Sequence, residues 1–237
     1  QITAEITHPG KGIAQGSVIA PLFSNIYLTQ IDRMLEKAKQ VTSTEKYTDL
    51  EYVRFADDLT VLIYGHKRCE KLIKMVYSRL HEELDKLDIE INEEKTRIVD
   101  MCKGEKFCFL GFEFHRVKSR KGNWWIKKTP RTKSKKKLTN SLKYIFKRKS
   151  KSIKEIIDEI NPILRGWINY FRIGNSSKCF CYIKDWVYKK VIRYLMKSCQ
   201  RPGFGWNRWS KAFIYGVLEL YNDYKIRYCQ PESAANQ

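Results

Sequence analysis

Apolar residues in the first quarter of the chain change from helical to strand-like spacing. Over residues 17–38 they recur every three or four positions, which predicts a helix after a loop, residues 9–16, that contains three glycines. Residues 51–55 and 59–64 are short runs rich in β-branched and aromatic side chains. Such runs predict two antiparallel strands joined by a tight, acidic turn.

The next segments continue this mixture of helix and strand. Helical spacing returns over residues 66–87, and residues 96–100 and 107–115 again have the composition of strands. Short strands interspersed with amphipathic helices predict helices packed on an antiparallel sheet. We therefore expect an α+β fold, with a first domain over residues 1–128.

The second half of the chain has a helical pattern throughout. Ser152 and Glu155 have the spacing of a capping box and precede a long apolar face. Pro162 lies inside this stretch, and we expect it to bend or break the helix. A further helix is predicted over residues 178–198. The second domain, residues 129–237, is therefore expected to be α-helical.

Charge indicates the class of partner. The chain has 46 Lys and Arg against 26 Asp and Glu, a net charge of +20, which favours nucleic acid over an anionic membrane. Eleven cations and no acidic residue lie between Arg131 and Lys154. A solvated helix face is the alternative, but like charges this dense repel one another unless a polyanion is near. The predicted RNA-binding residues here are Arg131, Lys133, Lys135, Lys136, Lys137, Lys143, Lys147, Arg148, Lys149 and Lys151.

Other features narrow the class of protein. No apolar run approaches the roughly 20 residues that cross a bilayer, and the opening residues have no signal-peptide core. Seven cysteines without framework spacing indicate reduced thiols. Cys179 and Cys181 form a weak zinc signal, and we interpret them as small hydrophobic residues near a core. An intracellular, cytoplasmic protein without a membrane partner is expected.

Asp57 and Asp58 are the candidate chemical groups. Phosphoryl transfer between nucleotides uses two divalent cations held by carboxylates, and Mg²⁺ prefers such hard oxygen ligands. A hairpin with adjacent aspartates at its turn supplies part of that arrangement. Asp also tolerates tight-turn geometry, so a purely structural role for the pair stays open.

Five ordered segments carry a resemblance to a known family. They are GIAQGSVIAPLFSNIYL, YVRFADDLTVLIYG, NEEKTRIV, FCFLGFEF and NPILRGWINYFR. The first four resemble the later palm blocks of reverse transcriptases, most closely those of group II intron-encoded proteins, and the last resembles the intron maturase domain. The resemblance covers nearly the whole chain. It implies a partial reverse-transcriptase palm followed by an α-helical thumb, or maturase domain, in a bacterial protein.

The resemblance also implies roles for individual residues. It places Mg²⁺ at Asp57 and Asp58 and a catalytic role, on the leaving pyrophosphate, at Lys95, although Lys95 is equally well an ordinary solvated charge. The implied partners are structured intron RNA, an RNA template with a DNA primer, and dNTPs. The remaining positions are Gln15, Gly16, Ser17, Phe55 and Ala56 for the template and nucleotide pocket, Leu110, Gly111 and Phe112 for the primer grip, and Arg165 for RNA.

Departures from the family pattern limit what is expected of this chain. The resemblance places the fingers and another catalytic aspartate before Gln15, so we expect an incomplete two-metal site and no significant polymerase activity in the isolated chain. Phe55 replaces the usual Tyr, and Ala14 the usual Pro. A non-catalytic splicing cofactor and a general nucleic-acid-binding protein stay open as alternatives. An RNA-templated RNA polymerase is less favoured, since those enzymes usually have Gly at the position of Ala56.

Tryptophans add a second possible mode of nucleic-acid binding. Exposed aromatic rings stack on unpaired bases, and Trp124, Trp125, Trp206 and Trp209 are candidates. Aromatic side chains are more often part of a core. Trp167 in particular lies on the apolar side of its predicted helix.

Overall fold

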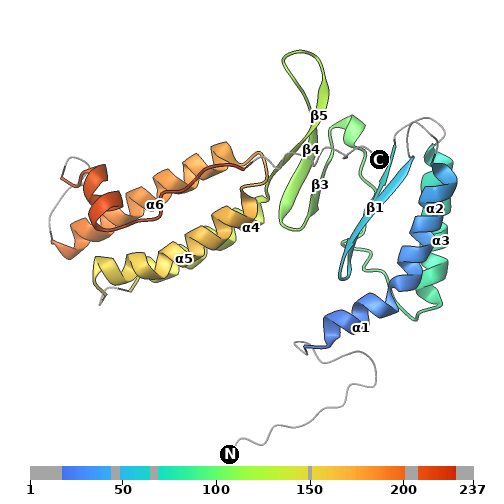
Figure 1. The fold of residues 1–237 in the computed structure, drawn as a ribbon, viewed down its shortest axis with the longest axis horizontal. Coiled ribbons are helices and arrows are strands. Elements are labelled where there is room, and N and C mark those ends of the chain that lie inside the picture. The colour runs from blue at the N-terminus through green and yellow to red at the C-terminus, as the bar shows by residue number, and fades with distance from the viewer. Residues whose placement is uncertain (1–17, 44–48, 65–68, 149–150, 201–207, 228–237) are drawn as a thin grey trace, which may run out of the picture. The chain divides into compact units, whose positions relative to one another are not determined.

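The computed structural model describes residues 18–43, 49–64, 69–148, 151–200 and 208–227. Helices and antiparallel strands alternate in the first part and helices dominate the second, so the predicted α+β fold class is confirmed (Figure 1). The chain divides into two compact units, Gln1–Ile98 and Val99–Gln237. The domain boundary expected after residue 128 stays a prediction.

The first unit packs helices on one hairpin. Its elements are α1 (Ala20–Tyr27), α2 (Thr29–Thr42), β1 (Leu50–Phe55), β2 (Asp58–Ile63) and α3 (Cys69–Asp85). Its core contains Ile31 and Leu35 of α2, Leu50 of β1 and Val76 of α3. The two strands lie where the sequence predicted them.

The helix predicted over residues 17–38 is in fact two helices. Leu28 separates α1 from α2 and leaves the helical region, with φ −83° and ψ 2°. The Thr29 hydroxyl donates to the Asn25 carbonyl at 2.9 Å, a side-chain interaction that competes with the backbone and bends helices. The apolar spacing continues across this break, so the periodicity alone does not reveal it.

The second unit begins with a three-stranded sheet. The short helix η1 (Met101–Lys103) precedes β3 (Lys106–Phe109), β4 (Phe112–Lys118) and β5 (Trp124–Pro130), which pair antiparallel in the order β3-β4-β5. The strand predicted over residues 107–115 is thus a hairpin.

The strand predicted over residues 96–100 is wrong, because those residues form no strand in the structure. Asp100 instead caps η1, and its carboxylate accepts a hydrogen bond from the Cys102 N–H at 2.8 Å. A side chain that satisfies a helix N-terminus in this way competes with strand pairing.

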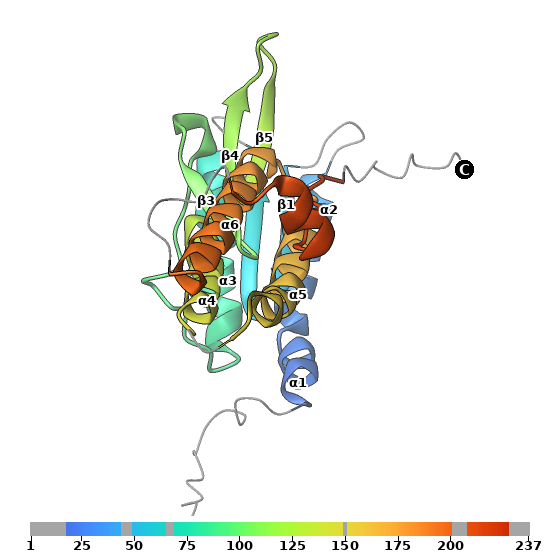
Figure 2. The ribbon, with the colours of Figure 1, turned by 90° about the vertical axis from the view of Figure 1, so that its left-hand side faces the viewer.

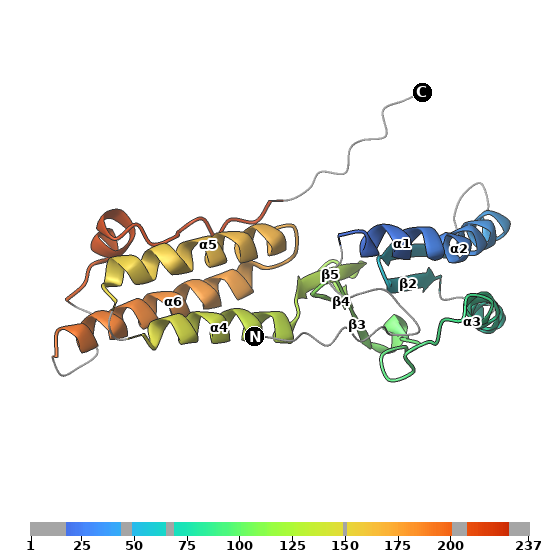
Figure 3. The same ribbon diagram turned by 90° about the horizontal axis from the view of Figure 1, so that it is seen from below.

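Three helices, which pack side by side in Figure 3, form the main core of the second unit. They are α4 (Thr132–Phe146), α5 (Ile153–Phe171) and α6 (Ser177–Ser198), followed by the short helix η2 (Phe213–Val217). The predicted capping box at Ser152 and Glu155 is present. Pro162 does not break α5, because the buried face continues from Ile160 to Leu164 and keeps both halves on the core.

The turn between α5 and α6 docks on β5. The Asn175 N–H donates to the Lys128 carbonyl at 2.7 Å, and the Asn175 side-chain oxygen accepts from the Lys128 N–H at 3.0 Å. Gly174 beside it is buried, and a Cβ there would lie 2.9 Å from the Lys128 carbonyl oxygen and 3.0 Å from the Phe112 ring. The sheet and the helices are therefore joined through a position that has room only for glycine.

We expect Gly174→Ala to destabilise the protein by about 1–3 kcal/mol, since the added methyl group overpacks a contact that includes backbone. Gly166→Ala is the matched control, because a Cβ at Gly166 meets nothing within 4 Å and Gly166 lies inside α5. Alanine favours helix over glycine by about 1 kcal/mol, so this variant should be slightly more stable. Urea unfolding followed by tryptophan fluorescence measures both changes. Equal stability of the two variants would contradict the proposed close packing at Gly174.

Candidate functional site

The acidic turn is a two-residue connection between β1 and β2. Phe55 pairs with Asp58 in the hairpin register, which leaves Ala56 and Asp57 as the central residues. Ala56 has a φ of +54°, a conformation that costs a non-glycine residue roughly 1–2 kcal/mol. Asp57, Asp58 and Phe55 are all exposed. The turn therefore presents two adjacent carboxylates to solvent.

Arg54 holds this turn against the helices. Its Nε donates to Asp32 Oδ1 at 2.8 Å, and its Nη2 donates to Asp32 Oδ2, so the guanidinium pairs with both carboxylate oxygens. Its Nη1 donates to the Ala56 carbonyl at 2.9 Å and to Asn25 Oδ1 at 3.1 Å. The hydrogen bond to Asp32 raises the pKa of Arg54. One guanidinium thus fixes the strained turn to α1 and α2.

Sequence reasoning missed Arg54, although a signal was present. Residues of one strand alternate between faces, so Arg54 shares the covered face of β1 with Leu50 and Tyr52. A charged side chain on a covered face needs a partner. The partner, Asp32, lies 22 positions away, and the spacing does not identify it.

The predicted metal ligands are only partly assembled. Asp57 and Asp58 have the chemistry that Mg²⁺ prefers, but in the described part of the chain no group of three or more His, Cys, Asp or Glu residues is placed to hold a metal ion. Gln15, Gly16 and Ser17 of the predicted pocket lie outside the described residues. Asp57 and Asp58 can thus supply some, but not all, of the protein ligands of a magnesium site.

Lys95 lies in a turn that Asn92 caps. The Lys95 N–H donates to Asn92 Oδ1 at 3.1 Å, and the Thr96 N–H donates to the Asn92 carbonyl at 2.9 Å. The Lys95 side chain is exposed. Its role on pyrophosphate therefore stays a prediction.

Side chains of α4 and α5 form hydrogen bonds to the predicted primer-grip turn. Leu110 and Gly111, with φ of +46° and +76°, join β3 to β4. The Tyr170 hydroxyl donates to the Leu110 carbonyl at 2.8 Å, and the Ser134 hydroxyl donates to the Gly111 carbonyl at 3.2 Å. A Cβ at Gly111 would meet Ser134 Oγ at 3.3 Å. Two segments that the sequence treated separately therefore form one structure.

Aromatic rings complete this junction. Phe112 is buried and contacts Tyr170 and Phe171, with ring centroids 5.8 Å and 4.8 Å apart. Trp167 lies 4.6 Å from Phe171 and packs against two core clusters. The expectation that Trp167 faces the core is confirmed.

Lysines cover one side of α4. By the helical period, four of them and the C-cap residue Lys147 lie away from the buried Leu138, Leu142 and Ile145. We name this set the α4 lysine face, and its exposed members are Lys133, Lys136, Lys137, Lys143 and Lys147.

Other predicted RNA-binding cations have different surroundings. Arg148 forms an ion pair with Glu159 at 3.2 Å, and Lys151 also pairs with Glu159, whose pKa both cations lower, Lys151 most strongly. The charge of these two is therefore partly compensated within the protein. Arg131 and Arg165 are exposed, Lys135 is half-buried, and Lys149 lies outside the described residues.

Helix α6 adds cations that the sequence reasoning did not include. Lys190, Arg193 and Lys197 follow one another at intervals of three and four, so they share a side of the helix. The pKa of Lys190 is lowered by burial and then by the charges of Arg193, Lys143 and Lys197. The Tyr194 hydroxyl donates to the Arg148 carbonyl at 3.1 Å and ties α6 to the end of α4. These α6 cations and the α4 lysine face form one positive region.

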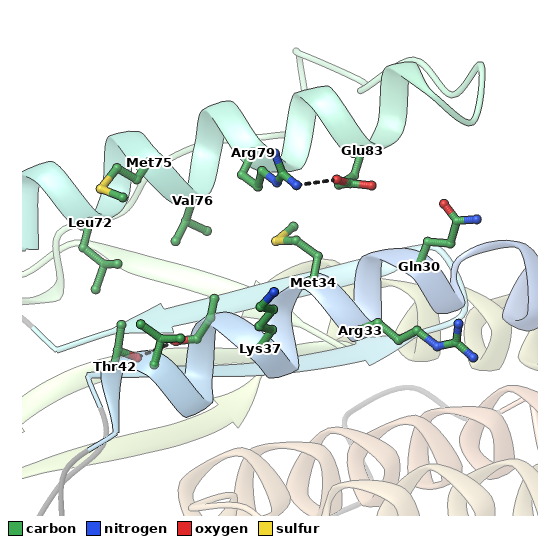
Figure 4. Close-up of a pocket in the computed structure, with 12 residues that line it drawn as sticks. Gln30, Arg33, Met34, Lys37, Thr42, Leu72, Met75, Val76, Arg79 and Glu83 are labelled. Carbon is green, nitrogen blue, oxygen red and sulfur yellow. Dashed lines mark hydrogen bonds and ion pairs between the residues drawn. The ribbon is translucent and has the colours of Figure 1, made fainter.

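A groove of about 590 Å³ lies between α2 and α3 (Figure 4). Its lining combines apolar residues such as Met34 and Val76 with the cations Arg33, Lys37 and Arg79. It contains none of the residues that the sequence predicted as a site. The predicted catalytic residues of the first unit, Asp57, Asp58 and Lys95, thus lie outside this groove.

Two further expectations concern cysteines and membranes. Cys179 packs against the main helical core, and burial raises the pKa of its thiol, whereas Cys181 is exposed. Cys179 thus behaves as a small hydrophobic residue. In the ranges that the structure describes, no helix combines the length and apolar composition required to cross a bilayer.

Comparisons with known proteins match both halves of the chain. The family model "Reverse transcriptase (RNA-dependent DNA polymerase)" matches residues 3–114, and "Group II intron, maturase-specific domain" matches residues 135–213. The COX1/OXI3 intron 1 protein of Saccharomyces cerevisiae is 30% identical over an alignment of 148 positions, and the match covers 44% of this chain and 17% of that protein. Protein YkfC of Escherichia coli K12 is 27% identical over an alignment of 142 positions, and the match covers 50% of this chain and 36% of that protein.

The order of the two matches identifies the family. A reverse-transcriptase domain precedes a maturase-specific domain in one chain, in agreement with the resemblance of the five sequence segments. The chain spans only 17% and 36% of the length of the two curated relatives. This protein belongs to the group II intron reverse transcriptase/maturase family.

Proposed function

We propose that this chain is part of an RNA-directed DNA polymerase that binds structured intron RNA, assists its splicing and copies RNA into DNA. The observation that carries the proposal is the exposed turn of Asp57 and Asp58, held to the helices by Arg54, in a chain of this family. Its substrates are an RNA template with a DNA primer and dNTPs, and its location is the cytoplasm of a bacterium. Fixed carboxylates at an exposed turn suit metal-assisted phosphoryl transfer.

Each group has a proposed task in that reaction. Asp57 and Asp58 hold Mg²⁺, which when bound supplies charge for the attacking and leaving oxygens. Lys95 stabilises the pyrophosphate that leaves. The remaining tasks are positioning of template and nucleotide by Gln15, Gly16, Ser17, Phe55 and Ala56, and placement of the primer by Leu110, Gly111 and Phe112.

The chain alone has a narrower expected activity. That the isolated chain does not extend a primer stays a prediction, and magnesium-dependent extension by the purified chain would contradict it. Binding of RNA by the helical region needs no metal, so it is testable in this chain as it stands. The α4 lysine face and the α6 cations are the proposed contact surface.

Neutralising the α4 lysine face should weaken RNA binding and flatten its salt dependence. Each phosphate contact contributes roughly 0.7–0.9 to the slope of log affinity against log salt, so changing five lysines that each contact one phosphate to Gln should lower the slope by about 3.5–4.5. At low salt we expect at least about a tenfold loss of affinity for a folded group II intron RNA. Fluorescence anisotropy at KCl concentrations from about 50 to about 300 mM measures both quantities, and this range spans physiological salt.

A charge-matched variant tests whether position matters. It changes five exposed lysines elsewhere to Gln, and these are Lys37, Lys71, Lys74, Lys211 and Lys225. Equal losses in both variants would mean that only net charge attracts RNA, which contradicts a dedicated surface. An unrelated RNA of equal length shows whether the intron fold is preferred.

A further inference from the structure

The β4–β5 hairpin extends past the third strand of its sheet. Strand β3 pairs with β4 only as far as His115, whereas β4 and β5 pair on to Lys118 and Trp124. In Figure 2 the β4–β5 hairpin extends beyond the end of β3. Two hydrogen bonds between Ser119 and Asn123 close the loop at the end. The Ser119 N–H donates to the Asn123 carbonyl at 2.7 Å, and the Asn123 N–H donates to the Ser119 hydroxyl at 3.1 Å. We call residues 116–126 the hairpin end.

The hairpin end exposes three large apolar side chains in succession. Trp124, Trp125 and Ile126 are 55%, 41% and 50% exposed. Successive residues of a strand point to opposite faces, so Trp124 and Trp125 lie on different faces of the ribbon. Neither is part of the core clusters of the second unit. Exposure of adjacent large rings at one end of a hairpin indicates an interaction surface.

Cations accompany the tryptophans on both faces. The Arg116 guanidinium carbon lies 4.4 Å from the centroid of the Trp124 ring. Lys118, the cross-strand neighbour of Trp124, has its Nζ 5.9 Å from the same centroid. Arg116 also donates to the Cys102 thiol at 3.0 Å, which fixes the guanidinium beside the ring. Between His115 and Lys128 there is no acidic residue, and the six cations are Arg116, Lys118, Arg120, Lys121, Lys127 and Lys128.

We propose that the hairpin end binds unpaired RNA, with bases stacked on Trp124 and Trp125 and phosphates held by the neighbouring cations. Exposed rings alternating with cations are the arrangement that single-stranded nucleic acid recognises, because every base has a face that stacks and every nucleotide carries a charge. This surface is separate from the α4 lysine face, and it deepens the proposed function, on which it rests.

A lipid surface fits these residues less well. Lys118 shares a face with Trp124, and Lys127 shares a face with Trp125, as the strand register requires. Either tryptophan could enter a bilayer only with a cation on the same face, and desolvating that charge is costly. A protein partner would have to supply several carboxylates opposite six cations, whereas RNA supplies one phosphate per nucleotide.

The test compares single-stranded and duplex RNA. The double variant Trp124→Ala/Trp125→Ala should lose about tenfold affinity per stacked base for a 12-nucleotide single-stranded RNA and little affinity for a blunt duplex of equal length. Its salt slope should stay that of the parent, because no charge is removed. Trp124→Phe/Trp125→Phe keeps a stacking ring and should recover part of the loss. Unchanged single-strand affinity, or equal losses on both RNAs, overturns the proposal.

Further variants separate this proposal from the proposed function. The charge variant Arg120→Gln/Lys121→Gln, in the exposed loop, should weaken single-strand binding and lower the salt slope of that binding. This variant tests the proposal even if the tryptophan variants do not fold. If the α4 lysine variant loses RNA binding while all hairpin variants keep it, the inference fails and the proposed function stands. If the parent chain binds no RNA, both fail. Loss of binding to vesicles of 3:1 phosphatidylcholine and phosphatidylserine, with RNA binding intact, assigns the hairpin end to lipid instead.

Discussion

Asp57→Asn and Asp58→Asn should each reduce RNA-templated DNA synthesis by about a thousandfold, if loss of one metal-binding carboxylate costs about 4 kcal/mol of transition-state stabilisation. Asn keeps the size of the side chain and its turn propensity but removes the charge that holds Mg²⁺. Both aspartates are exposed, so stability should change by less than about 0.5 kcal/mol. The measurement is primer extension by a polymerase in which this chain follows the N-terminal part of a group II intron reverse transcriptase.

The control and a direct metal measurement make this result specific. Asp85→Asn removes an exposed carboxylate at the end of α3 and should leave synthesis unchanged. Titration of the purified chain with Mn²⁺, followed by electron paramagnetic resonance, should show weaker binding in the Asp57 variant than in the control. Synthesis that survives both substitutions would assign the turn a structural role.

The same variants separate the polymerase from its main alternative. A non-catalytic splicing cofactor needs the RNA-binding surfaces but not the carboxylates, so its splicing assistance would be insensitive to Asp57→Asn. A polymerase that also assists splicing should lose DNA synthesis and keep RNA binding. If a folded variant loses both DNA synthesis and RNA binding, the turn also contacts RNA.

Local patterns in the sequence were sufficient for most elements. The β1–β2 hairpin, the capping box at Ser152 and the helices around it follow from residue spacing and from side chains that bond within a few positions. The division of the first predicted helix at Leu28 was missed, because a threonine that bonds back to the helix leaves the apolar period intact. Local propensity and tertiary structure agree where one segment determines both.

Contacts between distant segments were beyond such patterns. The hydroxyl of Tyr170 meets the carbonyl of Leu110, 60 positions away, and nothing in either segment specifies the other. Likewise, Lys190 joins the positive region of α4 only because α6 packs beside that helix. Sequence motifs therefore named the candidate residues, whereas the fold determines which of them act together.

The ion pair of Arg54 and Asp32 shows what such a distant contact is expected to do. Arg54→Lys keeps the charge but loses the planar fork that binds both oxygens of Asp32 and also reaches the Ala56 carbonyl. Ala56 is in a strained conformation, so a turn without this hydrogen bond should relax. A displacement of about 1 Å in a catalytic group costs about a hundredfold in rate, and we expect synthesis to fall by about that factor.

A double-mutant cycle distinguishes this positioning role from general destabilisation. The side chains of Arg54 and Asp32 are 11% and 27% exposed, so we expect a coupling energy of about 2 kcal/mol, below the roughly 3–5 kcal/mol lost when a fully buried pair is broken. Arg79 and Glu82, a pair that is more than half exposed, should couple by less than about 1 kcal/mol. Because positioning affects the metal-binding turn, Arg54→Lys should also lower kcat at saturating Mg²⁺, whereas a variant that is merely less stable recovers full kcat once it is folded. Recovery of kcat by Arg54→Lys at low temperature, where the folded state predominates, would reduce Arg54 to a structural residue.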